Sequence, residues 1–293
     1  MGKSKSYATA GAFRTALEER LKAASSEERM DVNRLRRQVS FDRLLARLFL
    51  NATPPWVLKG GYALELRFKS ARSTVDIDLT LEQIPQTLVG AEQNNQIIRD
   101  MLQASAEVDL QDWFEFSIGA PIMDLTAAPY GGARYPVDAR MAGRTFSRFH
   151  VDVGLGDVII RPAETIECRD WLAFAGIEKP SVRALTVEQQ FAEKLHAYTL
   201  PRSNMNTRVK DLVDMALLFE SCKLNALATA EAFKLTFEHR RTHEIPLNLP
   251  APAADWQRPF DSMAAECGMT KSMEEAFLEV RQFVEEIQAQ QLR

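Results

Sequence analysis

One short segment, in which polar and apolar residues alternate, constrains the fold more than any other feature of the chain. Val75-Asp76-Ile77-Asp78-Leu79-Thr80 has the pattern of a half-buried strand. Residues two apart on a strand point to the same face of the sheet, so Asp76 and Asp78 should project together. Two carboxylates on one face repel each other unless cations lie between them. The pair therefore suits divalent metals that prefer oxygen ligands, above all Mg²⁺ or alternatively Mn²⁺.

The segments before and after this region read as helices. From Phe13 to about Leu50, leucines recur at helical spacing until the pattern stops at Pro54-Pro55. After Lys179-Pro180, Thr186 and Gln189 form a capping-box signature that opens the first helix of a second helical stretch. Further helices are expected there over residues 206–221, 229–239 and 272–291, with a proline-rich connection over 246–259.

The middle segment mixes short strands with short helices. Helices are expected over 62–68 and 97–106, and strands over 56–58, 75–80, 114–118, 134–140 and 146–153, with a hairpin turn at 141–143. Several strands adjacent in sequence favour a mixed sheet over a parallel doubly wound one. We therefore predict an α+β fold of two lobes: residues 1–180 hold N-terminal helices and a mixed-sheet core at about 51–165, and residues 181–293 form a helical lobe.

The charge balance limits the classes of partner. Thirty-six Lys and Arg against 40 Asp and Glu give a net charge of −4, which excludes a basic surface over the whole molecule. A local basic strip for RNA could come from Arg36, Arg37, Arg43, Arg47, Arg240 and Arg241, although a solvated helix face explains these residues more simply. The sequence has no run of about 18 apolar residues, so no membrane span is expected. Three cysteines without metal or disulfide spacing indicate reduced thiols and a cytoplasmic location.

A glycine pair precedes the aspartate strand. Gly60-Gly61 follows the apolar run at 56–58 and precedes a short helix, where backbone N–H groups can approach a phosphate. Asp152 alternates with apolar residues in a later strand and supplies a third carboxylate. A phosphate cradle beside a two-metal platform indicates a nucleoside triphosphate site and phosphoryl or nucleotidyl transfer. The alternatives are a simple turn at Gly60-Gly61 and a solvated strand face at Asp76 and Asp78.

These residues together resemble a known family. Lys59-Gly60-Gly61 with Leu64, followed by Arg72-x-Thr74-x-Asp76-x-Asp78, is similar to the first motif of the DNA polymerase β-like nucleotidyltransferases. More narrowly, it resembles the AbiEii/AbiGii toxins of bacterial abortive-infection and toxin–antitoxin pairs. That branch pairs a lysine-bearing helix with a helix reading Arg-x-Lys-Asp-x-x-Asp, and the chain has Lys194 and then residues 208–214 in this order. The resemblance covers about residues 55–220.

The resemblance implies roles for three overlapping groups of residues. The metal ligands would be Asp76, Asp78 and Asp152. The nucleotide-binding residues would be Lys59, Gly60, Gly61, Thr74, Lys194, Arg208, Lys210 and Asp211. The catalytic residues would be Asp76, Asp78, Asp152, Lys194 and Asp214. Asp152 would also polarise the attacking hydroxyl, and Lys194 would contact the triphosphate.

The residues themselves leave other readings open. Lys194 could be an exposed lysine on a helix surface that contributes little to stability, and Arg208, Asp211 and Asp214 could form a salt-bridge row within one helix. The position after the glycine pair is Tyr62, where relatives often have a small hydroxyl residue, so Thr74 is expected to supply the nearest hydroxyl. His239 and His243 are four apart, which fits two ligands on one helix face, but the intervening Arg-Arg-Thr disfavours a metal.

By resemblance, the chain would be a Mg²⁺-dependent nucleotidyltransferase and a toxin neutralised by a partner encoded beside it. It would transfer a nucleoside monophosphate from an NTP to RNA, with the 3′ end of tRNA as the expected acceptor. One alternative keeps the chemistry with a protein acceptor. The other is an inactive nucleotidyltransferase fold that acts as a binding module, which the retention of all three aspartates disfavours.

Overall fold

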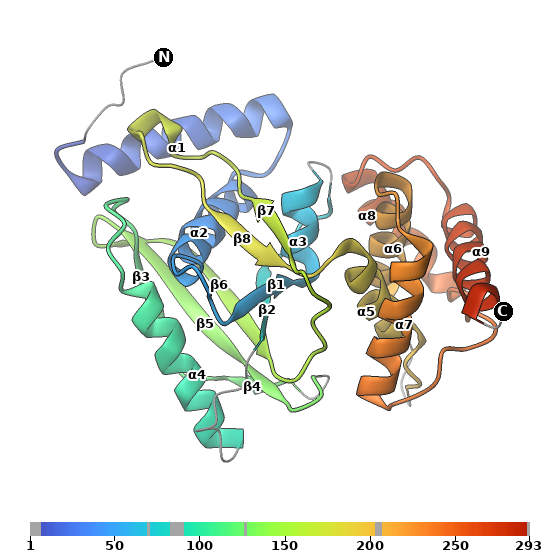
Figure 1. The fold of residues 1–293 in the computed structure, drawn as a ribbon. Helices are drawn as coiled ribbons and strands as arrows, with labels where there is room; N and C mark the ends of the chain where they lie inside the picture. Colours follow the sequence, from blue (N-terminus) through green and yellow to red (C-terminus); the bar gives the residue numbers. More distant parts are fainter. Residues whose placement is uncertain (1–6, 69–70, 83–90, 126–127, 203–206, 292–293) are drawn as a thin grey trace. The chain divides into compact units, whose positions relative to one another are not determined.

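The chain folds into two compact units (Figure 1). The structure is a computed structural model that describes residues 7–68, 71–82, 91–125, 128–202 and 207–291. The first unit comprises residues 1–62, 74–156 and 165–184, and the second comprises 63–73, 157–164 and 185–293. The division is therefore not a single cut, because two short segments from the first 164 residues belong to the second unit.

One mixed sheet forms the centre of the first unit (Figure 1). Its strands are β1 (Trp56–Lys59), β2 (Asp76–Leu81), β3 (Glu115–Ile118), β4 (Met123–Asp124), β5 (Gly132–Met141), β6 (Arg144–Gly154), β7 (Glu164–Glu167) and β8 (Ser181–Ala184). Their order is β3-β5-β6-β2-β1-β8-β7, with β4 paired to β5. The pairs β2/β6 and β1/β8 are parallel, whereas β1/β2, β3/β5 and β5/β6 are antiparallel. The predicted mixed sheet is confirmed, although β4, β7 and β8 were not predicted.

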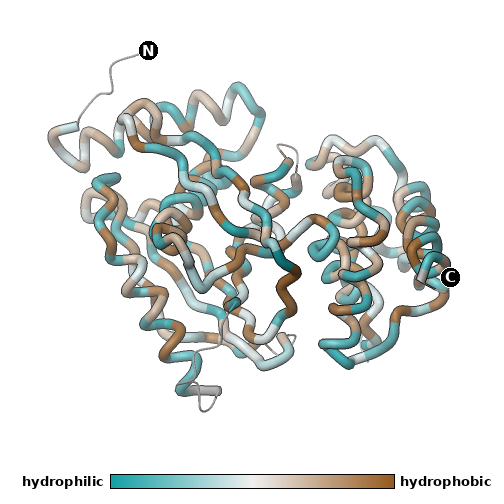
Figure 2. The backbone as a smooth tube through the Cα atoms, in the orientation of Figure 1, coloured by the Kyte–Doolittle hydropathy of each residue, from teal (hydrophilic) through white to brown (hydrophobic). Residues whose placement is uncertain are grey.

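Helices α1 (Ala10–Glu28), α2 (Val32–Leu48) and α4 (Ala91–Ala106) accompany this sheet, and α3 (Gly60–Arg67) begins at its glycine pair. The helical stretch expected from Phe13 to Leu50 is divided, because Arg29 adopts a left-handed conformation and Asp31 caps α2. Hydrophilic and hydrophobic segments alternate along these helices in Figure 2, as amphipathic helices require. On the inner side of α2, the Phe41 ring contacts Phe149 of β6.

The second unit is a helical domain with its own core. It contains α5 (Val187–Thr199), α6 (Val209–Ser221), α7 (Ala226–Arg240), α8 (Gln257–Glu266) and α9 (Met273–Gln291). The Thr186 hydroxyl accepts a hydrogen bond from the Gln189 backbone, as the capping signature predicts. Phe191, Leu212, Phe233 and others pack into a continuous apolar core. The expectation of a proline-rich connection up to Pro259 was wrong: α8 begins within it, because a proline in the first turn removes no intrahelical hydrogen bond.

Candidate active site

The sheet registers bring the predicted strand residues into two adjacent rows. One row runs across four strands, from Arg134 through Asp152 and Asp78 to Lys59. The neighbouring row contains His150 and Asp76. Residues in register share a face of the sheet, and the buried Ile77 and Leu79 point to the other face. We call Asp76, Asp78 and Asp152 the strand carboxylates.

An arginine that was not predicted to belong to the site holds two of the strand carboxylates. The Arg134 guanidinium donates two hydrogen bonds of 2.8 Å to the two Asp152 oxygens and one of 2.9 Å to Asp76 Oδ2. These bonds to Asp152, with the charges of Asp152 and Asp76, raise the pKa of Arg134 further above its usual value. His150 Nδ1 lies 3.1 Å from the other Asp76 oxygen. Asp76 and Asp152 therefore converge on one cationic group.

The contacts of the strand carboxylates also determine how they lie relative to one another at the expected metal site. Over the described residues, no three or more His, Cys, Asp and Glu side chains form a ready metal-binding cluster. Arg134 lies between Asp76 and Asp152, and Asp78 faces the glycine pair instead. A Cβ added at Gly60 would lie only 2.0 Å from Asp78 Oδ2, and Gly60 has a positive φ of 68°. Only glycine fits this position, so the backbone turn comes directly against the Asp78 carboxylate.

Tyr62, which follows the glycine pair, is turned into the core. Its hydroxyl donates to the buried Asp42 carboxylate of α2, which also accepts a 2.9 Å hydrogen bond from the Trp171 indole N–H. Burial raises the pKa of Asp42 to about 6, although these hydrogen bonds oppose the shift. The Tyr62 hydroxyl is thus committed to the core, and Gly61 is buried beside it. The Thr74 hydroxyl donates to the Asp76 carbonyl oxygen at 3.5 Å, and its expected contact with a phosphate stays a prediction.

The second unit gathers the other predicted residues in a buried ion-pair network of Arg72, Lys194, Arg208, Asp211 and Asp214. Lys194 Nζ lies 2.7 Å from Asp214 Oδ2 and 3.3 Å from Asp211 Oδ1. Arg72 donates two hydrogen bonds of 2.8 and 2.7 Å to the two Asp214 oxygens. The Asp214 side chain is fully buried, and only 12% of the Lys194 side chain is exposed.

Electrostatics keeps this network charged. Burial alone would lower the pKa of Lys194, but Asp214 and Asp211 raise it to about 12. Burial alone would raise the pKa of Asp214, but Lys194 and Arg72 hold it below its usual value. The interpretation of Lys194 as an exposed lysine that contributes little to stability was therefore wrong.

The contact within α6 is the weaker part of the network. Arg208 lies 3.4 Å from Asp211, farther than the contacts that Lys194 and Arg72 make with Asp214. Lys210, another predicted nucleotide-binding residue, is exposed on the first turn of α6. A salt-bridge row within one helix therefore does not explain the arrangement, because its strongest partners come from α5 and the segment before β2. Arg72 was quoted in the motif but not given a role.

The expected basic strip does not form. Arg43 and Arg47 are buried and both donate to the buried Asp112, while Arg36 pairs with Glu18. In the second unit, Arg240 contacts Asp157 at 2.8 Å. Neither an RNA-binding strip nor a solvated helix face describes Arg43, Arg47 and Arg240. They are mostly internal ion-pair partners.

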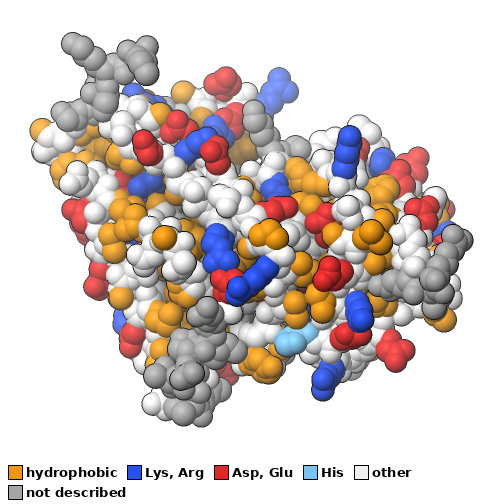
Figure 3. All heavy atoms as spheres, viewed as in Figure 1, with side chains coloured by type: hydrophobic (Ala, Val, Ile, Leu, Met, Phe, Trp, Pro, Cys, Tyr) orange, Lys and Arg blue, Asp and Glu red, His pale blue; other side chains and the backbone are white. Residues whose placement is uncertain are grey.

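The visible surface carries both signs of charge (Figure 3). Basic and acidic side chains are interspersed over the face shown, in agreement with the small net charge. No helix among the described residues combines the length and the apolar character that crossing a membrane requires.

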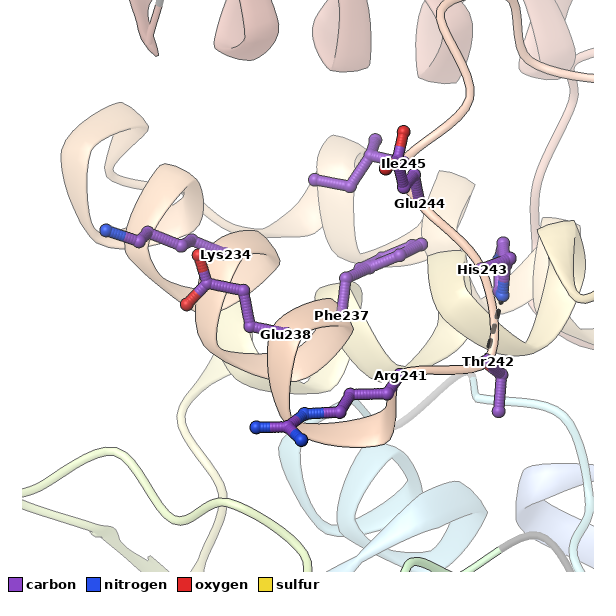
Figure 4. Close-up of a pocket in the computed structure, with 8 residues that line it drawn as sticks. All are labelled: Lys234, Phe237, Glu238, Arg241, Thr242, His243, Glu244 and Ile245. Atoms are coloured by element: carbon purple, nitrogen blue, oxygen red, sulfur yellow. Dashed lines mark hydrogen bonds between the residues drawn. The ribbon is translucent and has the colours of Figure 1, made fainter.

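His243 lines a pocket in the second unit (Figure 4). It does not share a helix with His239. Helix α7 ends at Arg240, so the four-residue spacing does not put the two histidines on one helix face. His243 Nδ1 is hydrogen-bonded to the Thr242 hydroxyl, and its Nε2 to the Thr199 hydroxyl at 2.8 Å. Its ring contacts His196 and Phe237. These contacts assign His243 a packing role at the pocket wall.

Comparison with known proteins decides the family. Residues 43–280 match the AbiEii nucleotidyl transferase toxin of type IV toxin–antitoxin systems. The chain belongs to the AbiEii nucleotidyltransferase toxin family. The match covers most of the chain and includes both the strand carboxylates and the ion-pair network, so the resemblance read from the motifs is confirmed.

One solved structure, MenT4, agrees with this assignment at the level of the fold. The AbiEii-family chain is similar to MenT4, a nucleotidyltransferase toxin from Mycobacterium tuberculosis H37Rv, with a TM-score of 0.51 and 16% identity over 88% of this chain and 93% of MenT4. It also matches JHP933 from Helicobacter pylori, with a TM-score of 0.43 and 14% identity over 88% of this chain and 92% of that one. A search of curated proteins finds no match.

Membership in the family establishes three points about this AbiEii-family chain. It is a nucleotidyltransferase, its substrate class is a nucleoside triphosphate, and it is the toxin of a type IV toxin–antitoxin pair, which implies an antitoxin counterpart.

Proposed function

We propose that this toxin transfers a nucleoside monophosphate from an NTP to the 3′ hydroxyl of an RNA, with the 3′ end of tRNA as the acceptor. The observation that carries the proposal is the group of strand carboxylates, which lie on two adjacent parallel strands, with Asp78 against a glycine turn. Carboxylate oxygens beside backbone N–H groups suit the metal-assisted transfer of a phosphate group.

The oxygen donors of the strand carboxylates fit Mg²⁺ in their chemistry, although as they lie the three do not form one cluster. Asp76 and Asp152 already converge on one cation, the Arg134 guanidinium, and their contacts with it are 2.8–2.9 Å long. Asp76, Asp78 and Asp152 would hold the ion, which when bound neutralises phosphate charge and favours the deprotonated acceptor hydroxyl. Arg134 would have to release at least one carboxylate oxygen for this, because its guanidinium donates to both Asp152 oxygens and to Asp76 Oδ2.

The chain's own residues account for the remaining roles. The backbone N–H groups of Gly60 and Gly61 hold the phosphates, and Asp152 receives the proton of the acceptor hydroxyl. The hydroxyl oxygen attacks the α-phosphorus, and the bond from the α-phosphorus to the oxygen bridging to the β-phosphorus breaks, so pyrophosphate leaves with the bonding electrons. The triphosphate contacts expected of Lys194, Arg208 and Lys210 stay predictions, because Lys194 is paired with Asp211 and Asp214 inside the second unit.

The test incubates the purified protein with each α-labelled NTP, Mg²⁺ and total cellular RNA, and asks which macromolecule becomes labelled. Label in RNA, concentrated in tRNA and lost in Asp76→Asn, is the expected result. Asp100→Asn, which changes an exposed aspartate of α4 in the same way, should transfer normally. Label in protein instead of RNA would mean that the acceptor is a protein. No transfer by the wild type with any NTP would favour an inactive binding module and reject the proposal.

A further inference from the structure

A pocket of about 500 Å³ lies beside Asp76 in the first unit and is not explained by the nucleotide-binding residues. Six of its lining residues carry the argument: Arg37, Val75, Asp76, Pro136, Arg148 and His150. Its volume lies within the roughly 300–1,000 Å³ of small-ligand sites. The pocket is therefore large enough for a nucleotide.

The register of the sheet explains why this space exists. Strand β2 begins at Asp76, which pairs with His150, whereas β6 begins six residues earlier at Arg144. The part of β6 before His150 pairs with β5 on one side and has no β2 residue in register on the other. The pocket adjoins this part of β6, and Arg37 of α2 reaches it as well.

The pocket and the glycine turn lie on opposite sides of β2. The order β5-β6-β2-β1 puts Gly60, at the end of β1, on one side of Asp76 and puts Pro136, Arg148 and His150 on the other. In a phosphoryl displacement, the attacking and leaving oxygens lie roughly in line on opposite sides of phosphorus. If the triphosphate lies against the glycine turn, the attacking hydroxyl must approach from the side of the pocket.

The lining residues suit a nucleotide of an RNA strand. Arg37 and Arg148 supply positive charge, and 76% of the Arg148 side chain is exposed; Asp138, which also lines the pocket, lies 3.6 Å from it. Val75, which is 56% exposed, and Pro136 give apolar surface beside these cations. Arginines contact phosphate oxygens, while apolar surface packs against a base or ribose.

We propose that this pocket is the acceptor subsite, which binds the 3′-terminal nucleotides of a single-stranded RNA end so that the terminal hydroxyl faces Asp76 and Asp152. The inference rests on the proposed transfer to RNA and adds the residues that recognise the acceptor. Arg148 binds a backbone phosphate there, and Arg37 adds positive charge.

The experiment measures the binding of a fluorescein-labelled single-stranded RNA of about eight nucleotides by anisotropy at several salt concentrations. Arg148→Gln should weaken binding about tenfold, the effect of losing one charged hydrogen bond. It should also lower the slope of log Kd against log salt by about 0.7, the contribution of one phosphate contact in a single strand. Arg148→Lys should restore the salt slope. Arg144→Gln, on the same strand but outside the pocket lining, is the matched control and should bind like the wild type.

Steady-state transfer separates the possible results. The proposal expects a raised KM for RNA and an unchanged KM for the NTP in Arg148→Gln. A raised KM for the NTP with normal RNA binding would assign the pocket to the nucleotide, and unchanged values for both would reject a substrate role; either result overturns the proposal. If the wild type labels protein or nothing, the proposed transfer to RNA itself fails. If the wild type labels RNA but the Arg148 variants bind RNA with normal affinity, only the acceptor subsite is refuted.

Discussion

The buried ion-pair network makes Lys194 a strong test of the structure. Lys194→Met keeps the apolar stem of the side chain but removes the charge, and leaves Asp211 and Asp214 buried. Removing one partner of a buried pair costs about 3–5 kcal/mol in unfolding free energy. Arg72 still donates two hydrogen bonds to Asp214, so we expect a smaller loss of about 2–3 kcal/mol. At about 2–4 °C per kcal/mol, the melting temperature should fall by roughly 5–10 °C.

Differential scanning calorimetry of purified wild type and variant measures this change. Lys210→Met is the matched control for stability alone, because Lys210 is exposed on α6 one residue before Asp211, and its loss should stay within about 0.5 kcal/mol. Turnover is compared well below both melting temperatures. If Lys194 also binds triphosphate, Lys194→Met should lose roughly 10²–10³ in kcat. A melting temperature equal to that of the wild type would refute the buried pairing, whatever the activity.

Three further changes test the other charged groups. Burial, together with the charges of Arg240 and His243, lowers the pKa of His196 to about 3. Between about pH 6.5 and this value, the imidazole is therefore protonated in the unfolded chain but neutral in the folded one. Stability should fall by about 3 kcal/mol as the pH drops from 6.5 to about 4, and His196→Asn should flatten this pH dependence in urea titrations. Asp112→Ala leaves two buried arginines uncompensated and should cost about 3–5 kcal/mol by urea unfolding; a loss below 1 kcal/mol would contradict their burial. Arg134→Met removes the cation that competes for Asp76, so Mn²⁺ affinity measured by calorimetry should rise about tenfold, and weaker binding would mean that Arg134 assists the metal.

The strand carboxylates could be predicted from the sequence because alternation alone determines which residues share a face. Arg134 could not be found in this way. Counting back from the hairpin turn, the pairs Met141–Arg144 and Arg140–Thr145 would put Arg134 opposite Val151. An irregularity between Ala139 and Arg140 shifts the register by one residue and brings Arg134 opposite Asp152. A shift of one residue reverses the face of every side chain beyond it, and no residue pattern marked its position.

The helical half shows a different limit of sequence reasoning. Helical spacing and capping residues located α5, α6, α7 and α9, since these are local properties of the chain. The burial of Lys194 is not local. It depends on Arg72, which precedes Asp214 by 142 residues, and on an apolar core assembled from all the helices of the second unit. The motif identified the right residues, but it could not show that they neutralise one another inside the protein.

The discontinuity of the second unit sets an order of events during synthesis of the chain. Strand β8 completes the sheet at Ala184, and the first unit can fold once this residue has left the ribosome. Arg72 is made early, but its partner Asp214 follows 142 residues later, which is roughly 7–30 seconds at 5–20 residues per second. On a nascent chain, the sheet that carries the strand carboxylates can therefore fold before the ion-pair network of the second unit can form.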